Sequence, residues 1–195
     1  ISGYRGSPLG GYDQQLRAVQ KLLDAHDIKF WEGLNEDLGA TAVWGSQQLG
    51  LFPGARLDGL FGIWYGKAPG VDRTGDVFKH ANAAGTSPLG GVLAIVGDDH
   101  NCKSSTLPSQ SEYAMADAEI PVLNPASIQD VLDYGIHGWE MSRFSGAWVG
   151  LTALADTMDS GSVVDVTLSR LSIRKPDFQL PESGVHMRRG DVPLN

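Results

Sequence analysis

Short apolar runs alternate with segments of helical period along the chain, which is the pattern of a parallel sheet covered by helices. The clearest run is residues 91–96 (Gly-Val-Leu-Ala-Ile-Val), which is apolar on both pleats and predicts a central strand buried on both faces. Further strands are predicted at 1–4, 28–31, 59–65, 120–123, 147–151 and 163–168. We therefore expect an α/β fold with a doubly wound, mostly parallel sheet and helices on both faces.

The helical segments carry recognisable start signals. Asn35 and Ser127 stand where N-caps are expected, and the helix after Ser127 is predicted to run to about Met141. The small residues at 80–85 predict the start of a close-packed helix. Behind Asn35, a buried stripe is predicted at Leu38, Ala42 and Leu49.

Length and composition fit one globular domain with a sizeable core: 195 residues, of which 42% are apolar and 19% charged. From Arg174 on, proline and glycine interrupt every period. We therefore expect a domain at 1–173 and a linker at 174–195 toward a further domain. The chain opens on Ile1 in a strand-like stub, so we interpret it as part of a longer polypeptide.

Charge and cysteine content exclude several classes of partner. A net charge of −8 and a pI near 4.9 argue against nucleic acid and anionic membranes, which attract clustered Lys and Arg. Because the sequence has no apolar run approaching eighteen residues and no charged-then-apolar start, we expect neither a membrane span nor a signal peptide. Cys102 is the single cysteine, so the chain has no internal disulfide or multi-cysteine cluster, which favours a reducing, cytoplasmic setting.

Polar loops follow the predicted strands. In open α/β sheets ligands bind beyond the carboxyl ends of the strands, where four loops are predicted to meet: 6–11, 32–37, 67–82 and 98–105. Neither the glycines at 6–11 nor Gly66-Lys67 has the spacing of a nucleotide-binding loop, which argues against a general nucleotide-binding domain. Side chains of the adjacent Asp98, Asp99 and His100 diverge on an extended chain, so we expect no metal site.

The combination and order of these loops resembles the pyrimidine-binding domain of thiamine-diphosphate-dependent 2-oxoacid:ferredoxin oxidoreductases, most closely the long, fused indolepyruvate ferredoxin oxidoreductases. The resemblance spans nearly the whole chain. The resemblance implies oxidative decarboxylation of an arylpyruvate to an acyl-CoA, with electrons passing to ferredoxin, in a homo-oligomer. The stretches that carry it are 2–8 (Ser-Gly-Tyr-Arg-Gly-Ser-Pro), 35–40 (Asn-Glu-Asp-Leu-Gly-Ala), 78–82 (Phe-Lys-His-Ala-Asn), 97–100 with Ser104-Ser105, and 120–123 (Ile-Pro-Val-Leu).

Glu36 is the residue to which the resemblance gives the catalytic role. In the family, the matching glutamate begins a helix after the second strand and hydrogen-bonds N1′ of the cofactor's aminopyrimidine ring. A carboxylic acid shared with N1′ favours the reactive form of the cofactor. The simpler alternative is an acidic residue in the first turn that complements the helix dipole.

The other implied contacts are less specific. Lys79, His80 and Asn82 match a segment beside the cofactor, although a histidine near a helix is often a hydrogen-bonded structural residue. Ser7 matches a turn that faces the 2-oxoacid. Arg5 departs from the shorter oxidoreductases of the family, where a proline commonly precedes this turn, and its guanidinium is a second candidate contact for the substrate carboxylate. The alternatives are a local turn hydrogen bond for Ser7 and a contact with a neighbouring domain for Arg5.

The resemblance also implies that this chain holds half a site. In the family, magnesium and the diphosphate are bound by a different domain through a Gly-Asp-Gly segment. That segment does not occur here, because Gly75-Asp76-Val77, Gly97-Asp98-Asp99 and Gly190-Asp191-Val192 differ at the third position. We expect a diphosphate-binding partner domain, with iron–sulfur clusters and the coenzyme A site elsewhere. The remaining alternative is an accessory domain of the same fold, used for assembly, whose site is vestigial.

Overall fold

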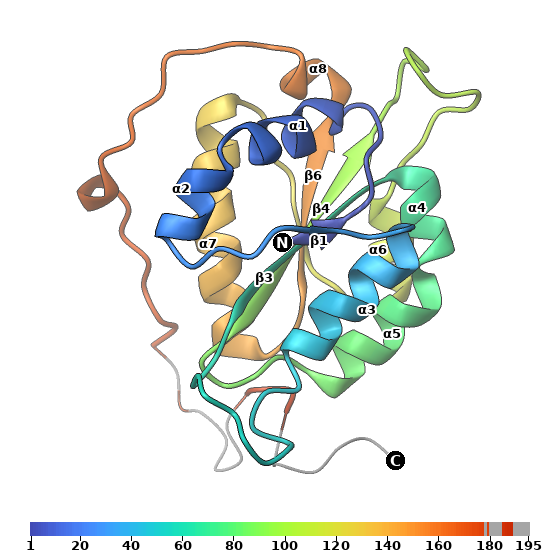
Figure 1. Cartoon of the computed structure of the whole chain (residues 1–195). Coiled ribbons are helices and arrows are strands. Elements are labelled where there is room, and N and C mark those ends of the chain that lie inside the picture. Colours follow the sequence, from blue (N-terminus) through green and yellow to red (C-terminus); the bar gives the residue numbers. More distant parts are fainter. Residues whose placement is uncertain (178, 180–184, 189–195) are drawn as a thin grey trace.

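The computed structural model describes residues 1–177, 179 and 185–188. Within these residues the strands form one six-stranded, all-parallel sheet in the order β2-β1-β3-β4-β6-β5 (Figure 1). The predicted α/β fold is therefore confirmed. The strands are β1 (Ser2–Gly3), β2 (Trp31–Glu32), β3 (Phe61–Lys67), β4 (Gly91–Asp98), β5 (Val122–Leu123) and β6 (Val149–Leu154).

Helices cover both faces of the sheet (Figure 1). One face carries α1 (Gly10–Ala18), α2 (Gln20–Ala25) and α7 (Ile128–Ser145). The other carries α3 (Glu36–Ser46), α4 (Ala68–Arg73), α5 (Gly75–Ala84) and α6 (Glu112–Asp117). A short helix α8 (Ala155–Met158) follows β6, and a 3-10 turn η1 (Leu168–Arg170) lies in the segment beyond it.

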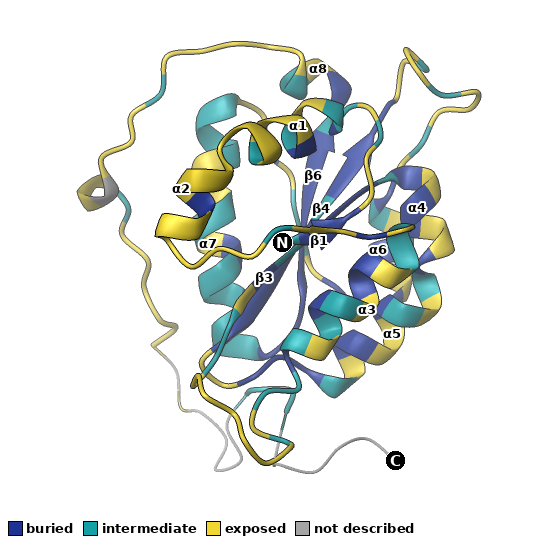
Figure 2. Cartoon of the chain, viewed as in Figure 1, coloured by how far each residue is buried: buried dark blue, intermediate teal, exposed yellow. Residues whose placement is uncertain are grey.

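Strand β4 is buried on both faces, as its continuous apolar run predicts (Figure 2). Val92, Ala94 and Val96 pack into the core beneath α3 and α5, where Trp64 and Phe78 meet edge to face. Alternate residues such as Leu93 point to the opposite face and pack against α7. Because side chains alternate along a strand, β4 contributes residues to the cores on both faces of the sheet.

A contact between two glycines sets how closely α3 approaches the sheet. A Cβ added at Gly39 of α3 would lie 2.8 Å from Cα of Gly3 in β1, a distance that real Cβ atoms essentially never show. The first turn of α3 is fixed from a second side, because the indole Nε1 of Trp64 donates to the carbonyl of Glu36 (3.0 Å). The start of α3 is therefore held against β1 and β3 together.

Both predicted caps are confirmed. Asn35 accepts from the backbone N–H of Leu38 (2.9 Å), and Ser127 accepts from that of Asp130 (3.2 Å). The stripe predicted behind Asn35 is wrong, because Leu38 is 45% exposed. The buried residues of α3 are instead Gly39, Ala40 and Val43. The glycine contact with β1 selects this face. The apolar and polar residues of α3 are only weakly separated around the helix, so the sequence carries little signal for it.

Two further expectations are corrected. The strand predicted at 163–168 is absent, since Val163 and Val166 are 98% and 76% exposed and the segment pairs with no strand. β-branched residues favour strands only where a neighbouring strand offers pairing and burial. The small residues at 80–85 end a helix rather than start one: α5 begins at Gly75 and stops at Gly85, whose φ is +73°.

The predicted linker lies only partly within the described residues. Residues 174–177 and 179 carry no helix or strand, and 178, 180–184 and 189–195 are outside the described part. Residues 185–188 return to the domain, where Met187 N donates to the Ser145 carbonyl (2.7 Å) and Arg188 donates to the Gly85 carbonyl (2.8 Å). No helix in the described part of the chain is long and apolar enough to cross a membrane.

Replacing Gly39 with valine should destabilise the fold by about 3 kcal/mol or more, because the added atoms meet the backbone of β1. Urea unfolding followed by circular dichroism measures the change. Gly45→Val is the matched control in the same helix, since a Cβ there meets nothing within 4 Å, and its effect should stay within about 0.5 kcal/mol. Equal effects of the two substitutions would contradict this account of the packing.

Candidate functional site

The candidate site lies at the carboxyl edge of the sheet, between β1 and β3. The connection after β1 runs through α1 and α2 on one face, and the connection after β3 runs through α4 and α5 on the other. Neighbouring strands whose connections leave on opposite faces open a crevice at their carboxyl ends, and ligands of open α/β sheets bind there. The loops after β1 and β2 and the last residue of β3 meet at this point.

Glu36 projects over the carboxyl end of β3 from the first turn of α3. A Cβ at Gly66 would lie 3.4 Å from its Cγ, and one at Gly70 would lie 2.6 Å from its Oε1. Two glycines therefore make the space that the Glu36 side chain fills, and only 14% of that side chain is exposed. The carboxylate is packed sideways against α4 and lies at the rim.

The Glu36 carboxylate keeps its hydrogen-bonding capacity. Among the described residues its closest cation is Arg73, whose Nη1 lies 4.0 Å from Oε2, and no hydrogen bond to the carboxylate is formed. Arg73 also faces the more exposed Asp37, with Nε 3.6 Å from Oδ2. Buried polar groups are generally paired, so a mostly buried carboxylate without a donor suits a ligand that brings an N–H group.

The turn after β1 lies against the ends of β3 and β4. A Cβ at Gly6 would lie 3.1 Å from Cβ of Lys67, and one at Gly97 would lie 3.1 Å from Cδ of Pro8. Ser7 is exposed and precedes Pro8 through a cis peptide bond. Arg5 is exposed at the start of the same turn. The structure thus places both predicted substrate contacts in the turn after β1, the strand that neighbours β3.

Lys67, the last residue of β3, is a candidate that the sequence analysis did not select. It lines a polar cleft of about 590 Å³ between the start of α4 and residues 104–111. Its Nζ donates to the carbonyl (3.0 Å) and to Oγ (3.2 Å) of Ser104, which leaves one ammonium donor. The signal that would have found it is a charged residue at the carboxyl end of a buried parallel strand.

Two adjacent aspartates build the loop that forms the far wall of this cleft. Asp98 is fully buried and accepts from the backbone N–H (2.8 Å) and the hydroxyl (2.6 Å) of Ser111. Burial raises the pKa of Asp98, and the Ser111 hydrogen bonds oppose that rise. Within the described part of the chain, no group of three or more metal-binding side chains is present.

Asp99 holds the turn that carries Ser104. Its carboxylate accepts from the backbone N–H groups of Ser104 (2.8 Å) and Lys103 (2.9 Å) and from the hydroxyl of Ser105 (2.9 Å). These donors stabilise the charged form and lower the pKa of Asp99 from 3.8 to about 2. Asp99 thereby holds Ser104 in the position where it accepts the hydrogen bonds from Lys67.

The residues predicted at 79–82 lie on α5 and are occupied elsewhere. Lys79 pairs with Asp117 (2.6 Å). The exposed His80 hydrogen-bonds the Asp76 carbonyl (2.9 Å), and its ring lies tilted beside that of Trp44, with the centroids 6.4 Å apart. Trp44 is eight residues along α3 from Glu36, which is roughly 12 Å.

Asn82 lies at the opposite edge of the sheet. Its amide donates to the carbonyls of Ala118 and Glu119 and accepts from the backbone N–H of Trp148, just before β6. These three hydrogen bonds connect α5 to the end of α6 and to the residue before β6, so the Asn82 amide is used within the protein. The structure therefore does not bring Lys79, His80 and Asn82 together with Glu36, and their predicted cofactor contacts have no support in this geometry.

Comparison with known proteins gives a structural likeness only. No family model matches the sequence, and no curated protein matches it. The fold is similar to that of a 2-oxoglutarate:ferredoxin oxidoreductase from Magnetococcus marinus, solved with 2-oxoglutarate, coenzyme A and succinyl-CoA bound. The TM-score is 0.59 at 16% identity, and the match covers 80% of this chain and 26% of that protein. The likeness establishes the fold. The chain therefore spans about a quarter of this neighbour's length.

Replacing Asp99 with asparagine should destabilise the chain near neutral pH, and the difference from the wild type should shrink as pH falls. The folded pKa of about 2 lies below the unfolded 3.8, so the contribution of Asp99 is complete above about pH 4 and is lost as pH falls toward 2. Urea midpoints at pH 7, 4, 3 and 2.5 measure this. Ser105→Ala, which removes one of the donors, should cost less. A difference that stays constant down to pH 2.5 would contradict the assignment.

Proposed function

We propose that this chain is the pyrimidine-binding half of the thiamine diphosphate site of a 2-oxoacid:ferredoxin oxidoreductase. The observation that carries the proposal is the Glu36 carboxylate, which is 14% exposed at the carboxyl edge and receives no hydrogen bond from the described residues. The likeness to an enzyme of this class supports it at the level of the fold. We propose further that the substrate is an arylpyruvate such as indolepyruvate, converted to its acyl-CoA.

The residues at the rim fit the pyrimidine part of the cofactor. When bound, thiamine diphosphate supplies the carbon nucleophile for decarboxylation of a 2-oxoacid. Glu36 would accept the N–H of the aminopyrimidine and hold or share that proton, which a carboxylate can do and an amide cannot. Gly66 and Gly70 leave the carboxylate free to face the ligand. A net charge of −8 and the absence of a Gly-Asp-Gly segment favour a second domain for the diphosphate and magnesium.

The substrate carboxylate would lie at the turn after β1. The Ser7 hydroxyl is one donor for it, and the exposed Arg5 is a second. We add the remaining ammonium donor of Lys67, because Lys67 follows Gly66, which touches the Glu36 side chain. This arrangement puts a positive group on the substrate side of the crevice and the proton-handling carboxylate on the cofactor side.

Glu36→Gln in the full-length enzyme should reduce 2-oxoacid oxidation by about 10²–10⁴-fold, the range typical of acid–base groups. Coenzyme-A-dependent reduction of ferredoxin measures it. Asp37→Asn is the matched control, since the adjacent carboxylate faces Arg73 at the surface, and it should leave turnover within about twofold of the wild type. Unimpaired turnover by Glu36→Gln would exclude the assignment and favour a vestigial site.

Lys67→Met should raise KM for the 2-oxoacid by about 10- to 100-fold, because a charge-assisted hydrogen bond contributes roughly 1.5–3 kcal/mol. Affinity for thiamine diphosphate should remain unchanged. Lys103→Met is the control, because Lys103 belongs to the same loop but pairs with Asp156 (3.1 Å) outside the cleft. Lys67→Arg should restore much of the affinity. An unchanged KM in Lys67→Met would remove Lys67 from the substrate site.

A further inference from the structure

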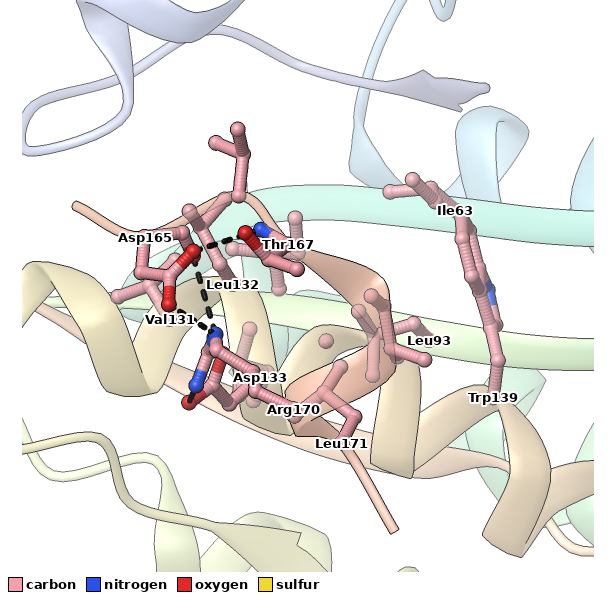
Figure 3. Close-up of a pocket in the computed structure, with 15 residues that line it drawn as sticks. Ile63, Leu93, Val131, Leu132, Asp133, Trp139, Asp165, Thr167, Arg170 and Leu171 are labelled. Atoms are coloured by element: carbon pink, nitrogen blue, oxygen red, sulfur yellow. Dashed lines mark hydrogen bonds and ion pairs between the residues drawn. The ribbon is translucent and has the colours of Figure 1, made fainter. Parts of the chain in front are cut away.

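A second cavity lies on the α7 face of the sheet, away from the carboxyl edge (Figure 3). Its volume is about 320 Å³, near the lower end of small-molecule sites, which run from roughly 300 to 1,000 Å³. Leu93, Ile95 and Leu151 of the sheet form the floor, and Val131 and Trp139 of α7 form one wall. All five side chains present apolar atoms to the cavity. The only polar group among them, the Trp139 indole N–H, is used in a hydrogen bond to the Gly62 carbonyl (3.2 Å).

The segment 165–171 lies beside α7 and forms the remaining wall (Figure 3). We name it the strap. Its Asp165 backbone exchanges two hydrogen bonds with the Gln129 amide, at 2.7 and 3.1 Å. Both terminal nitrogens of Arg170 donate to the carboxylate of Asp133 in α7, and its Nε donates to the Asp165 carbonyl (3.1 Å). The strap is thus fastened to the helix by polar contacts outside the apolar space.

The charges at the mouth of the cavity are satisfied by one another. Arg170 holds the pKa of Asp133 below its ordinary value, and Thr167 does the same for Asp165. Since these groups are already paired, they offer a charged ligand nothing, and an unpaired charge inside an apolar cavity is costly. The chemistry of the cavity therefore selects an uncharged molecule.

Gly135 of α7 lines the cavity, and close packing against the sheet does not account for a glycine at this position. Two glycines interrupt α7, and a glycine inside a helix costs about 1 kcal/mol relative to alanine. At Gly138 a Cβ would lie 2.7 Å from the Leu93 side chain, so the close packing of α7 on the sheet requires glycine there. At Gly135 a Cβ would meet nothing within 4 Å, and this residue lines the cavity.

We propose that the cavity between α7, the sheet and the strap is a binding site for a small, uncharged, apolar molecule, aromatic or branched aliphatic. The site is bounded by three parts of this chain, is lined mainly by apolar side chains, and keeps its volume because Gly135 lacks a side chain. It is separate from the crevice that contains Glu36, and it does not depend on the function proposed there.

Titration of the chain with the uncharged fluorophore N-phenyl-1-naphthylamine tests the site. We expect a saturable rise in probe emission with one site per chain. Gly135→Leu should weaken binding at least about tenfold, a change of about 1.4 kcal/mol, because the leucine fills the cavity. Gly45→Leu, at an equally open helical glycine of α3, should bind as the wild type does. No saturable binding, or equal affinity in both variants, would overturn the proposal.

Isoleucine methyl NMR of the wild-type chain tests the same site without a substitution, in case Gly135→Leu does not fold. Adding the probe should shift the methyl signals of Ile63, Ile95 and Ile136, which line the cavity. The signal of Ile120, packed in the core on the other face, should not move. Unmoved signals at all three cavity positions, or a dimer interface at these methyls that excludes the probe, would refute the proposal.

Discussion

The contact between Gly3 of β1 and Gly39 of α3 is the constraint on which the geometry of the candidate site depends. With the Cβ position of Gly39 2.8 Å from Cα of Gly3, helix and strand meet backbone to backbone. This fixes the height of α3 above the sheet and, with the Trp64 indole on the Glu36 carbonyl, its position along β3. Glu36 consequently emerges over the end of β3 at one defined place. The glycines at 66 and 70 then receive its side chain, so four close approaches around one helix start position one carboxylate.

The rest of the rim is organised around the same edge by different forces. Asp98 and Asp99 are adjacent, and both are fully buried, yet their pKa values shift in opposite directions. Desolvation dominates at Asp98, and donated hydrogen bonds from the following turn dominate at Asp99. Together they shape residues 99–111 into the wall that receives Lys67. The edge therefore combines the Glu36 carboxylate, which receives no hydrogen bond from the described residues, and the Lys67 ammonium, which has one donor to spare.

The two faces of the sheet are packed to different degrees. The face under α3, α4, α5 and α6 holds a continuous core with three large aromatic residues in edge contact, Trp64, Phe78 and Trp148. On the other face, the strap lines part of the space between α7 and the sheet. The α7 face retains a cavity of about 320 Å³ lined mainly by apolar side chains.

The sequence by itself determined the α/β class, the doubly buried strand at 91–96, the caps at Asn35 and Ser127, and the carboxyl edge as the location of the polar loops. These features follow from local periodicity and from side chains that bond their own neighbours in the chain. Tertiary structure alone decided which face of α3 is buried, that 163–168 form no strand, and that Asn82 serves the amino edge of the sheet. It also decided that Lys67 and Ser104 meet and that Gly135 borders empty space. Those outcomes depend on partners distant in sequence, whose approach is set by backbone contacts that no local pattern records.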